Sequence, residues 1–212
     1  MPGCTVFLGP SCDLAAARRV LPDAEFWPPA ARGDIARAAA DGASVIVLID
    51  GVFLQDCAVG HREVLGVLKS GVTVIGASSM GALRAAELDG LGMIGVGEVY
   101  RRYRSGELES DDEVALVYDP ESGYALSEPL VNIRATLEAA VANGAIAQIE
   151  ADAVLAAAQS LYFPERTWAT ILRRAAVPDA VRESLARHPP VDLKRADAVA
   201  ALEYARDLLA RL

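Results

Sequence analysis

The sequence predicts an α/β fold, a Rossmann-like parallel sheet with helices on both faces, followed by an α-helical C-terminal region. Strand-like and helix-like stretches alternate through the first half of the chain, which is typical of a parallel sheet. The stretches 44–49 and 72–75 are apolar at successive positions, as strands buried on both faces are. The chain from about residue 129 onward reads as helical.

Short apolar stretches bounded by glycine or proline define the expected strands, and longer periodic stretches define the expected helices. Strands are expected at 5–8, 24–27, 44–49 and 72–75. Helices are expected at 13–17, 32–41, 58–69, 80–88 and 98–104, with a hairpin across 114–126. The last helix carries an apolar stripe at three- and four-residue steps, formed by Val199, Leu202, Ala205, Leu209 and Leu212.

The chain is predicted to form two parts. Residues 1–128 form the α/β core that carries the site, and residues 129–212 form a helical region that packs on this core. We see neither an internal repeat nor a low-complexity linker between the two.

Composition narrows the classes of partner. The formal net charge of −9 argues against broad nucleic-acid or anionic-membrane binding, which needs basic surface, so neither partner is expected. Three cysteines without a CxxC pair favour neither a disulfide framework nor a zinc ribbon. No apolar run is long enough to span a membrane, and the N-terminus lacks the basic segment of a signal peptide, so a cytoplasmic location is expected.

No cofactor and no metal is expected. The chain has no GxxxxGK[ST] motif that would indicate ATP binding. Residues 90–95 match GxGxxG, but they follow a predicted helix rather than a strand, which argues against a dinucleotide site. The acidic stretch 111–113 has the ligand type of a hard cation without EF-hand spacing, and a solvated acidic surface is the simpler interpretation.

Ligands of open α/β sheets bind outside the carboxyl ends of the strands, so the segments 9–13, 50–57 and 76–80 are the places to search. The most informative segment joins a predicted strand to a predicted helix around Ser79. A nucleophile elbow needs small residues two positions before and after the nucleophile, and Ala77 and Gly81 occupy these positions. The alternative is that Ser78 or Ser79 simply caps the helix.

A serine nucleophile needs a base. His61, near the start of the helix after strand 44–49, is the candidate base, and Glu63 and Asp50 are the candidates to orient it. The alternative is a partly exposed helix histidine without a role. Cys12, and with less reason Cys57, is a candidate sulfur-carrying thiol, and the alternative for each is a buried cysteine that packs as a small hydrophobe.

Read together, several segments resemble the TfuA-like family over about the first two-thirds of the chain. The segments are VFLGPS at 6–11, PPAARGDI at 28–35, IDGVF at 49–53, HREVL at 61–65, GASSMGALRAAEL at 76–88, GMIGVGEVY at 92–100, DDEVAL at 111–116 and SEPLVNIR at 127–134.

The resemblance implies a partner in peptide-backbone thioamidation. TfuA-like proteins work with YcaO-type enzymes on a ribosomally made precursor peptide, and they are thought to supply sulfide by hydrolysing the C-terminal thiocarboxylate of a ThiS-like carrier protein. A non-catalytic adaptor that docks carrier and peptide onto the YcaO-type enzyme is the alternative. The hydrolase interpretation assigns catalysis to Ser79, His61 and Asp50. Substrate binding is assigned to Ser78, Gly76, Ser11, Arg84 and Arg134.

Overall fold

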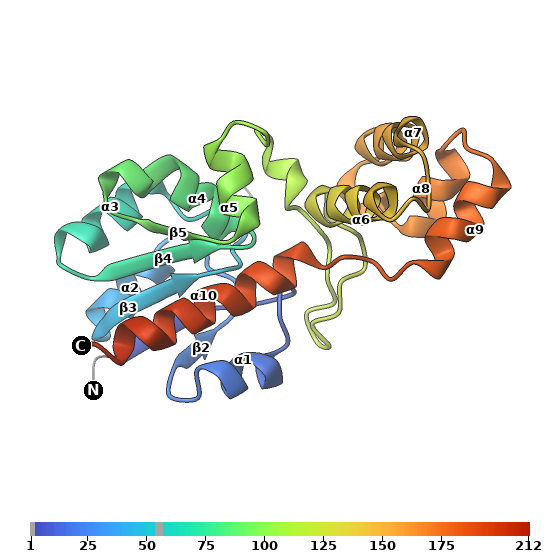
Figure 1. Cartoon of the computed structure of the whole chain (residues 1–212). Helices are drawn as coiled ribbons and strands as arrows, with labels where there is room; N and C mark the ends of the chain where they lie inside the picture. Colours follow the sequence, from blue (N-terminus) through green and yellow to red (C-terminus); the bar gives the residue numbers. More distant parts are fainter. Residues whose placement is uncertain (1–2, 54–56) are drawn as a thin grey trace. The chain divides into compact units, whose positions relative to one another are not determined.

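The computed structural model describes residues 3–53 and 57–212 and confirms the predicted α/β fold. Its centre is a five-stranded sheet with the order β2-β1-β3-β4-β5, in which every neighbouring pair is parallel. Helices cover the sheet, and further helices follow it in the chain (Figure 1).

The strands and helices have the following bounds. The strands are β1 Gly3–Phe7, β2 Glu25–Trp27, β3 Ala43–Leu48, β4 Thr73–Ala77 and β5 Ile94–Val96. The helices in the first half are α1 Leu14–Val20, α2 Asp34–Ala40, α3 His61–Lys69, α4 Met80–Leu88 and α5 Glu98–Arg104. The later helices are α6 Leu130–Ala142, α7 Gln148–Gln159, α8 Trp168–Arg174, α9 Asp179–Arg187 and α10 Leu193–Leu209.

Successive side chains of the strands face opposite sides of the sheet, and each side has its own helices. On β3, Val45 and Val47 pack in a cluster with residues of α1 and α10. Between them along the strand, Ile46 packs in a second cluster with residues of α2, α3 and α4. Continuous apolar strands are therefore buried on both faces, as the run at 44–49 predicted.

The chain divides into two compact units, which we describe separately. The sheet unit contains residues 1–111 and 194–212, and the helical unit contains residues 112–193. The last helix, α10, therefore belongs to the sheet unit, and its residues Ala198, Ala201, Leu202 and Ala205 are buried in the cluster shared with β3 and α1. The predicted division at residue 128 differs from these units and stays a prediction about domains.

Strand β5 and the end of α10 differ from the prediction, and the predicted hairpin is reduced. Strand β5 lies in a glycine-rich stretch where no strand was expected, and its three residues are half-buried at the edge of the sheet. Of the predicted apolar stripe on α10, Leu202 and Ala205 are buried, but Leu212 is 73% exposed beyond the helix end. The predicted hairpin is present as a single antiparallel bridge between Tyr118 and Ala125.

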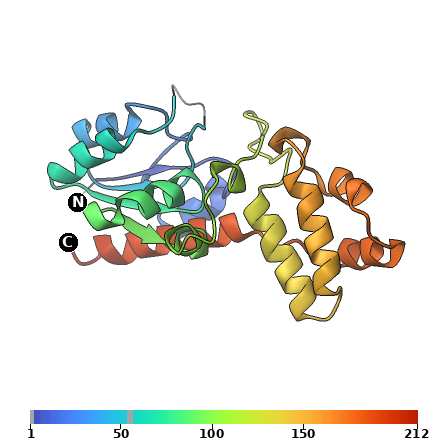
Figure 2. The same cartoon turned by 90° about the horizontal axis from the view of Figure 1, so that it is seen from above.

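Helices α6 and α7 pack side by side in the helical unit (Figure 2), and their buried residues form one apolar core with residues of α8 and α9. A buried cation lies at the edge of this core. Arg166 is 0% exposed, and its guanidinium donates to Asp112 Oδ2 at 2.6 Å and to the carbonyls of Ala158 and Leu161 at 3.2 and 3.1 Å. The guanidinium thereby joins the end of α7 to the segment that precedes α6.

Replacing Arg166 with methionine is expected to lower the free energy of unfolding of the helical unit by about 2–3 kcal/mol, because the carbonyls of Ala158 and Leu161 lose their buried donor and the partly exposed Asp112 loses its ion-pair partner. Urea unfolding followed by circular dichroism measures this change. Arg173→Met is the control on α8, since Arg173 makes one long side-chain contact, 3.4 Å to Thr170 Oγ1. Equal stability of the two variants would contradict the assigned role of Arg166.

Within the described residues, no helix is both long enough and apolar enough to cross a membrane.

Candidate functional site

The direction of the chain across the sheet changes between β1 and β3, because β2 lies on one side of β1 while β3, β4 and β5 follow on the other. Ligand sites of open sheets lie at such a switch point, outside the carboxyl ends of the strands. Asp50 follows β3 there and is 3% exposed. Its carboxylate accepts from the amides of Gly9 and Ser11 at 2.8 and 3.2 Å and from Ser11 Oγ at 2.6 Å. The structure therefore brings the predicted residues Ser11 and Asp50 together.

The next strand along this edge, β4, ends in a turn with two serines. Ser78 has φ +67°, and its side chain is 0% exposed with an Oγ that has no hydrogen-bond partner. Ser79 is the N-cap residue of α4 and is 2% exposed, but its side chain makes no capping bond. Among the described residues, Ser78 is the sole non-glycine residue with a positive φ. The alternative of a simple capping serine thus lacks the bond that defines a cap, and the Ser78 hydroxyl is buried without a partner.

Two glycines allow α4 to start directly against the sheet. A Cβ on Gly81 would lie 1.7 Å from the carbonyl oxygen of Leu48 on β3, and one on Gly76 would lie 2.2 Å from the carbonyl oxygen of Gly81. The Gly81 amide donates to the carbonyl of Ile49 at 3.2 Å. Gly76 was predicted as a substrate-binding residue, and its place in the structure is the contact between β4 and α4.

His61 makes a different contact from the predicted one. Its Nε2 lies 2.8 Å from Glu87 Oε2, and Arg84 Nη1 donates to the same oxygen at 2.7 Å. Arg84 Nε also donates to the carbonyl of Val59 at 2.8 Å, so both candidate residues are held in one surface network. Glu87 lies about two turns along α4 from Ser79, roughly 12 Å along the helix axis. The structure therefore does not place His61 against Ser79 or Asp50.

Arg134 lies on α6 in the helical unit. Its Nε and Nη2 donate to the two carboxylate oxygens of Glu113 at 2.9 and 2.8 Å, and Glu113 is 6% exposed. This bidentate pair fixes the guanidinium within its own unit.

Burial argues against Cys12 as the sulfur-carrying thiol. Cys12 is 3% exposed, and its Sγ lies 3.6 Å from the carbonyl oxygen of Asp13. A sulfur relay needs an accessible thiolate, so burial of Cys12 argues against that role. Burial raises the pKa of Cys4 to about 12. Cys57 is exposed, contrary to the alternative that it packs as a buried hydrophobe.

The first turn of α10 brings charged residues that the sequence did not predict for the site. Arg195 Nη1 lies 2.8 Å from Asp13 Oδ2, just after β1. Asp197 accepts from the amides of Glu98 and Val99, after β5, at 2.8 and 2.7 Å, and burial raises its pKa. Little in the sequence indicated that these residues contact segments that follow the strands, because charged residues beside the apolar stripe of a helix look like an interruption of the stripe.

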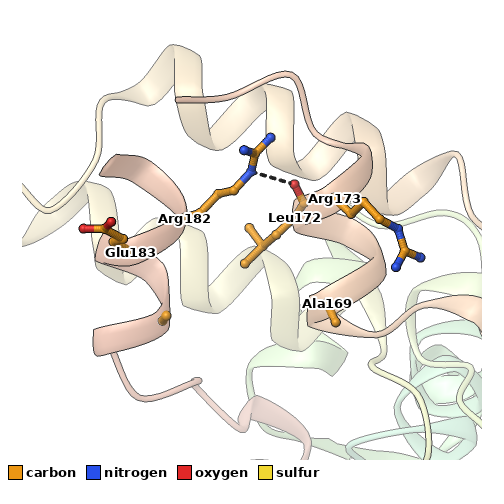
Figure 3. Close-up of a pocket in the computed structure, with 6 residues that line it drawn as sticks. Ala169, Leu172, Arg173, Arg182 and Glu183 are labelled. Atoms are coloured by element: carbon orange, nitrogen blue, oxygen red, sulfur yellow. Dashed lines mark hydrogen bonds between the residues drawn. The ribbon is translucent and has the colours of Figure 1, made fainter. Parts of the chain in front are cut away.

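A shallow hollow of about 530 Å³ lies in the helical unit, between α8 and α9 (Figure 3). Of the two arginines that line it, Arg182 donates from Nε to the carbonyl of Leu172 at 3.0 Å and also binds Asp179 and the carbonyl of Ala175. The fold therefore already uses this guanidinium, and none of the predicted site residues lines the hollow. Within 3–53 and 57–212, no three His, Cys, Asp or Glu side chains gather as metal ligands would.

The comparison with known families decides the assignment. The model of the TfuA-like protein family matches residues 50–167, more than half of the 212-residue chain. The chain belongs to the TfuA-like family. The TfuA-like match includes Asp50, His61 and both serines of the β4–α4 turn, whereas Ser11 and all of α10 lie outside it. A comparison with curated proteins gave no match.

Proposed function

We propose that this TfuA-like protein supplies sulfide to a YcaO-type enzyme by hydrolysing the C-terminal thiocarboxylate of a ThiS-like carrier protein. Membership of the TfuA-like family supports a role in the thioamidation partnership. The observation that carries the hydrolase proposal is the Ser78 hydroxyl in the β4–α4 turn, which is buried and has no hydrogen-bond partner; Ser79 beside it makes no capping bond. A buried polar group without a structural partner needs another explanation, and catalysis supplies one.

The conformation of the turn favours Ser78 over the predicted Ser79 as the nucleophile. The serine of a nucleophile elbow lies on a sharp, strained turn from strand to helix, and the positive φ belongs to Ser78. The spacing of small residues favours Ser79 instead, because Ala77 and Gly81 lie two positions before and after Ser79, whereas Gly76 and the larger Met80 flank Ser78 in the same way. Because Ser78 is buried, the residues that cover it must move before a carrier tail reaches its hydroxyl.

The reaction proceeds by acyl transfer in two steps. The serine oxygen attacks the thiocarboxylate carbon, the C–S bond breaks, and HS⁻ leaves with the proton of the serine hydroxyl. Water then attacks the acyl-serine, which releases the carrier carboxylate and a proton and restores the hydroxyl. Of the amides at the N-terminus of α4, those of Gly81 and Ala82 donate to the carbonyls of Ile49 and Ser79, which leaves the Met80 amide as the candidate donor to the developing oxyanion. His61 acts as the base only if it rotates away from Glu87.

Sulfide release from a thiocarboxylated ThiS-like carrier tests the proposal. Wild type is expected to release sulfide, Ser78→Ala to lose this activity, and Cys12→Ala to keep it. Ser79→Ala and His61→Ala decide the roles of these two predicted residues. If wild type releases no more sulfide than the carrier alone but still tightens peptide binding by the YcaO-type enzyme, the protein is an adaptor and the hydrolase proposal is wrong.

A further inference from the structure

The hollow between α8 and α9 lies in the basic part of an otherwise acidic unit. Helices α8 and α9 together carry four arginines and two carboxylates. The rest of the helical unit carries two arginines and ten carboxylates. Because complementary charge guides association, these two helices favour an acidic partner, which the remainder of the unit would repel.

The hollow combines an apolar lining with a cation that the fold does not use. Of its two arginines, Arg182 is held by an ion pair and main-chain carbonyls, as described above. Arg173 is exposed and points away from Arg182 (Figure 3), and within the described residues its one side-chain contact is 3.4 Å to the Thr170 hydroxyl. The apolar lining consists of Ala169, Leu172 and Ala186. An occupant that fits both features has an apolar side chain with a carboxylate close to it.

The hairpin of the same unit exposes apolar side chains. Residues 120–126 are all exposed, and among them Tyr124 is 75% and Leu126 is 58% exposed. A two-stranded hairpin is marginally stable by itself in water, and this one has a single antiparallel bridge. Packing Tyr124 and Leu126 against a partner would remove apolar surface from water and hold the hairpin in place.

The hairpin is also negatively charged. Its tip carries Asp119 and Glu121, and no lysine or arginine occurs from residue 105 to residue 133. The Asp119 carboxylate accepts from the Ser122 hydroxyl at 2.6 Å and from the Glu121 amide at 3.0 Å. These bonds, that of the hydroxyl first, lower the pKa of Asp119, so its carboxylate is charged at neutral pH. The hairpin therefore offers the two features that the hollow requires.

We propose that the hairpin of one copy of this chain docks in the hollow between α8 and α9 of a second copy. Tyr124 then lies against the apolar lining, and the Asp119 and Glu121 carboxylates pair with Arg173. The hairpin and α9 lie at opposite ends of the helical unit (Figures 1 and 2), so the hairpin does not reach the hollow of its own copy. Because the contact joins two different surfaces, it is heterologous and links copies head to tail.

Sedimentation velocity as a function of protein concentration tests this contact. Wild type is expected to form dimers or larger species as the concentration rises, and fewer of them at high salt, because the paired charges are exposed. Tyr124→Ser and Arg173→Glu are each expected to weaken self-association by about tenfold or more. Ile149→Ser is the matched control, since Ile149 is another exposed apolar residue of the helical unit, and it should associate as wild type does.

Two combinations of variants distinguish this contact from any other. Glu121→Arg should weaken association, and adding Arg173→Glu to it should restore association, because the charges are exchanged across the same contact. A mixture of Tyr124→Ser, which has an intact hollow, with Arg173→Glu, which has an intact hairpin, should form dimers and nothing larger.

The inference does not depend on the hydrolase proposal, because self-association is measured without carrier or sulfide. Wild type that stays monomeric at every concentration would overturn it. Association that both Tyr124→Ser and Arg173→Glu leave unchanged would overturn it as well, since the copies would then meet through another surface.

Discussion

Replacing Ser78 with glycine is expected to reduce sulfide release by about three orders of magnitude or more, while the free energy of unfolding stays the same or rises by about 1 kcal/mol. A loss of activity alone does not distinguish a catalytic residue from a structural one. Lost activity together with unchanged or higher stability distinguishes the two. This combination shows that the Ser78 side chain does not stabilise the fold and is needed for the reaction.

The expected gain in stability has two sources. A side chain at φ +67° costs roughly 1–2 kcal/mol in the left-handed region, and glycine does not pay this cost. Removal of the Ser78 hydroxyl also ends the burial of a polar group that has no partner. Glycine also increases the conformational entropy of the unfolded chain, which lowers the free energy of unfolding by about 0.5–1 kcal/mol and offsets part of this gain.

Two measurements on the same preparations test the catalytic role of Ser78. They are the rate of sulfide release from the thiocarboxylated carrier and the midpoint of urea unfolding. Ser70→Gly is the matched control, because Ser70 ends α3 with φ −80° and its hydroxyl donates to the carbonyl of Val67 at 2.7 Å. This control should lose some stability and keep its activity. Full activity in Ser78→Gly together with an inactive Ser79→Ala would return the nucleophile to Ser79.

Most of the sheet could be predicted from local signals. The buried strands β1, β3 and β4 are apolar at successive positions, and this pattern needs no knowledge of the partners of each strand. Strand β5 escaped prediction because its three residues lie between Gly92 and Gly97, and its pairing with β4 supplies what its sequence lacks. Likewise, no local pattern showed that α10, at the end of the chain, packs against the same sheet as α1, near its beginning.

The sequence gives more information on where the candidate site lies than on its chemistry. The rule that ligands bind at the carboxyl ends of strands selected the segments of Ser11, Asp50 and Ser78. Residues 54–56 of one selected segment lie outside the described residues. Which of two adjacent serines takes the left-handed φ depends on how α4 starts against the sheet, which glycine and alanine neighbours do not reveal. The pairing of His61 with Glu87 depends on side-chain reach between two helices, and no spacing rule along the chain predicts it.

Replacing Gly81 with alanine is expected to cost more than about 4 kcal/mol, enough to remove much of the stability of an ordinary domain. The added Cβ would lie 1.7 Å from the oxygen and 2.6 Å from the carbon of the Leu48 carbonyl. Both are main-chain atoms of the central strand β3, so no side-chain rotation relieves the clash. Helix α4 would have to move away from the sheet, which would also break the bond from the Gly81 amide to Ile49.

Gly66→Ala is the control for this effect, since it makes the same substitution on the neighbouring helix α3. No atom lies within 4 Å of the added Cβ at Gly66, so alanine is expected to stabilise the protein by about 0.5–1 kcal/mol through its better helix propensity. Circular dichroism during urea unfolding should therefore show opposite shifts for the two variants. If Gly81→Ala unfolds at the wild-type urea concentration, α4 does not start directly against β3, and the narrow serine turn that this contact creates would lose its structural basis.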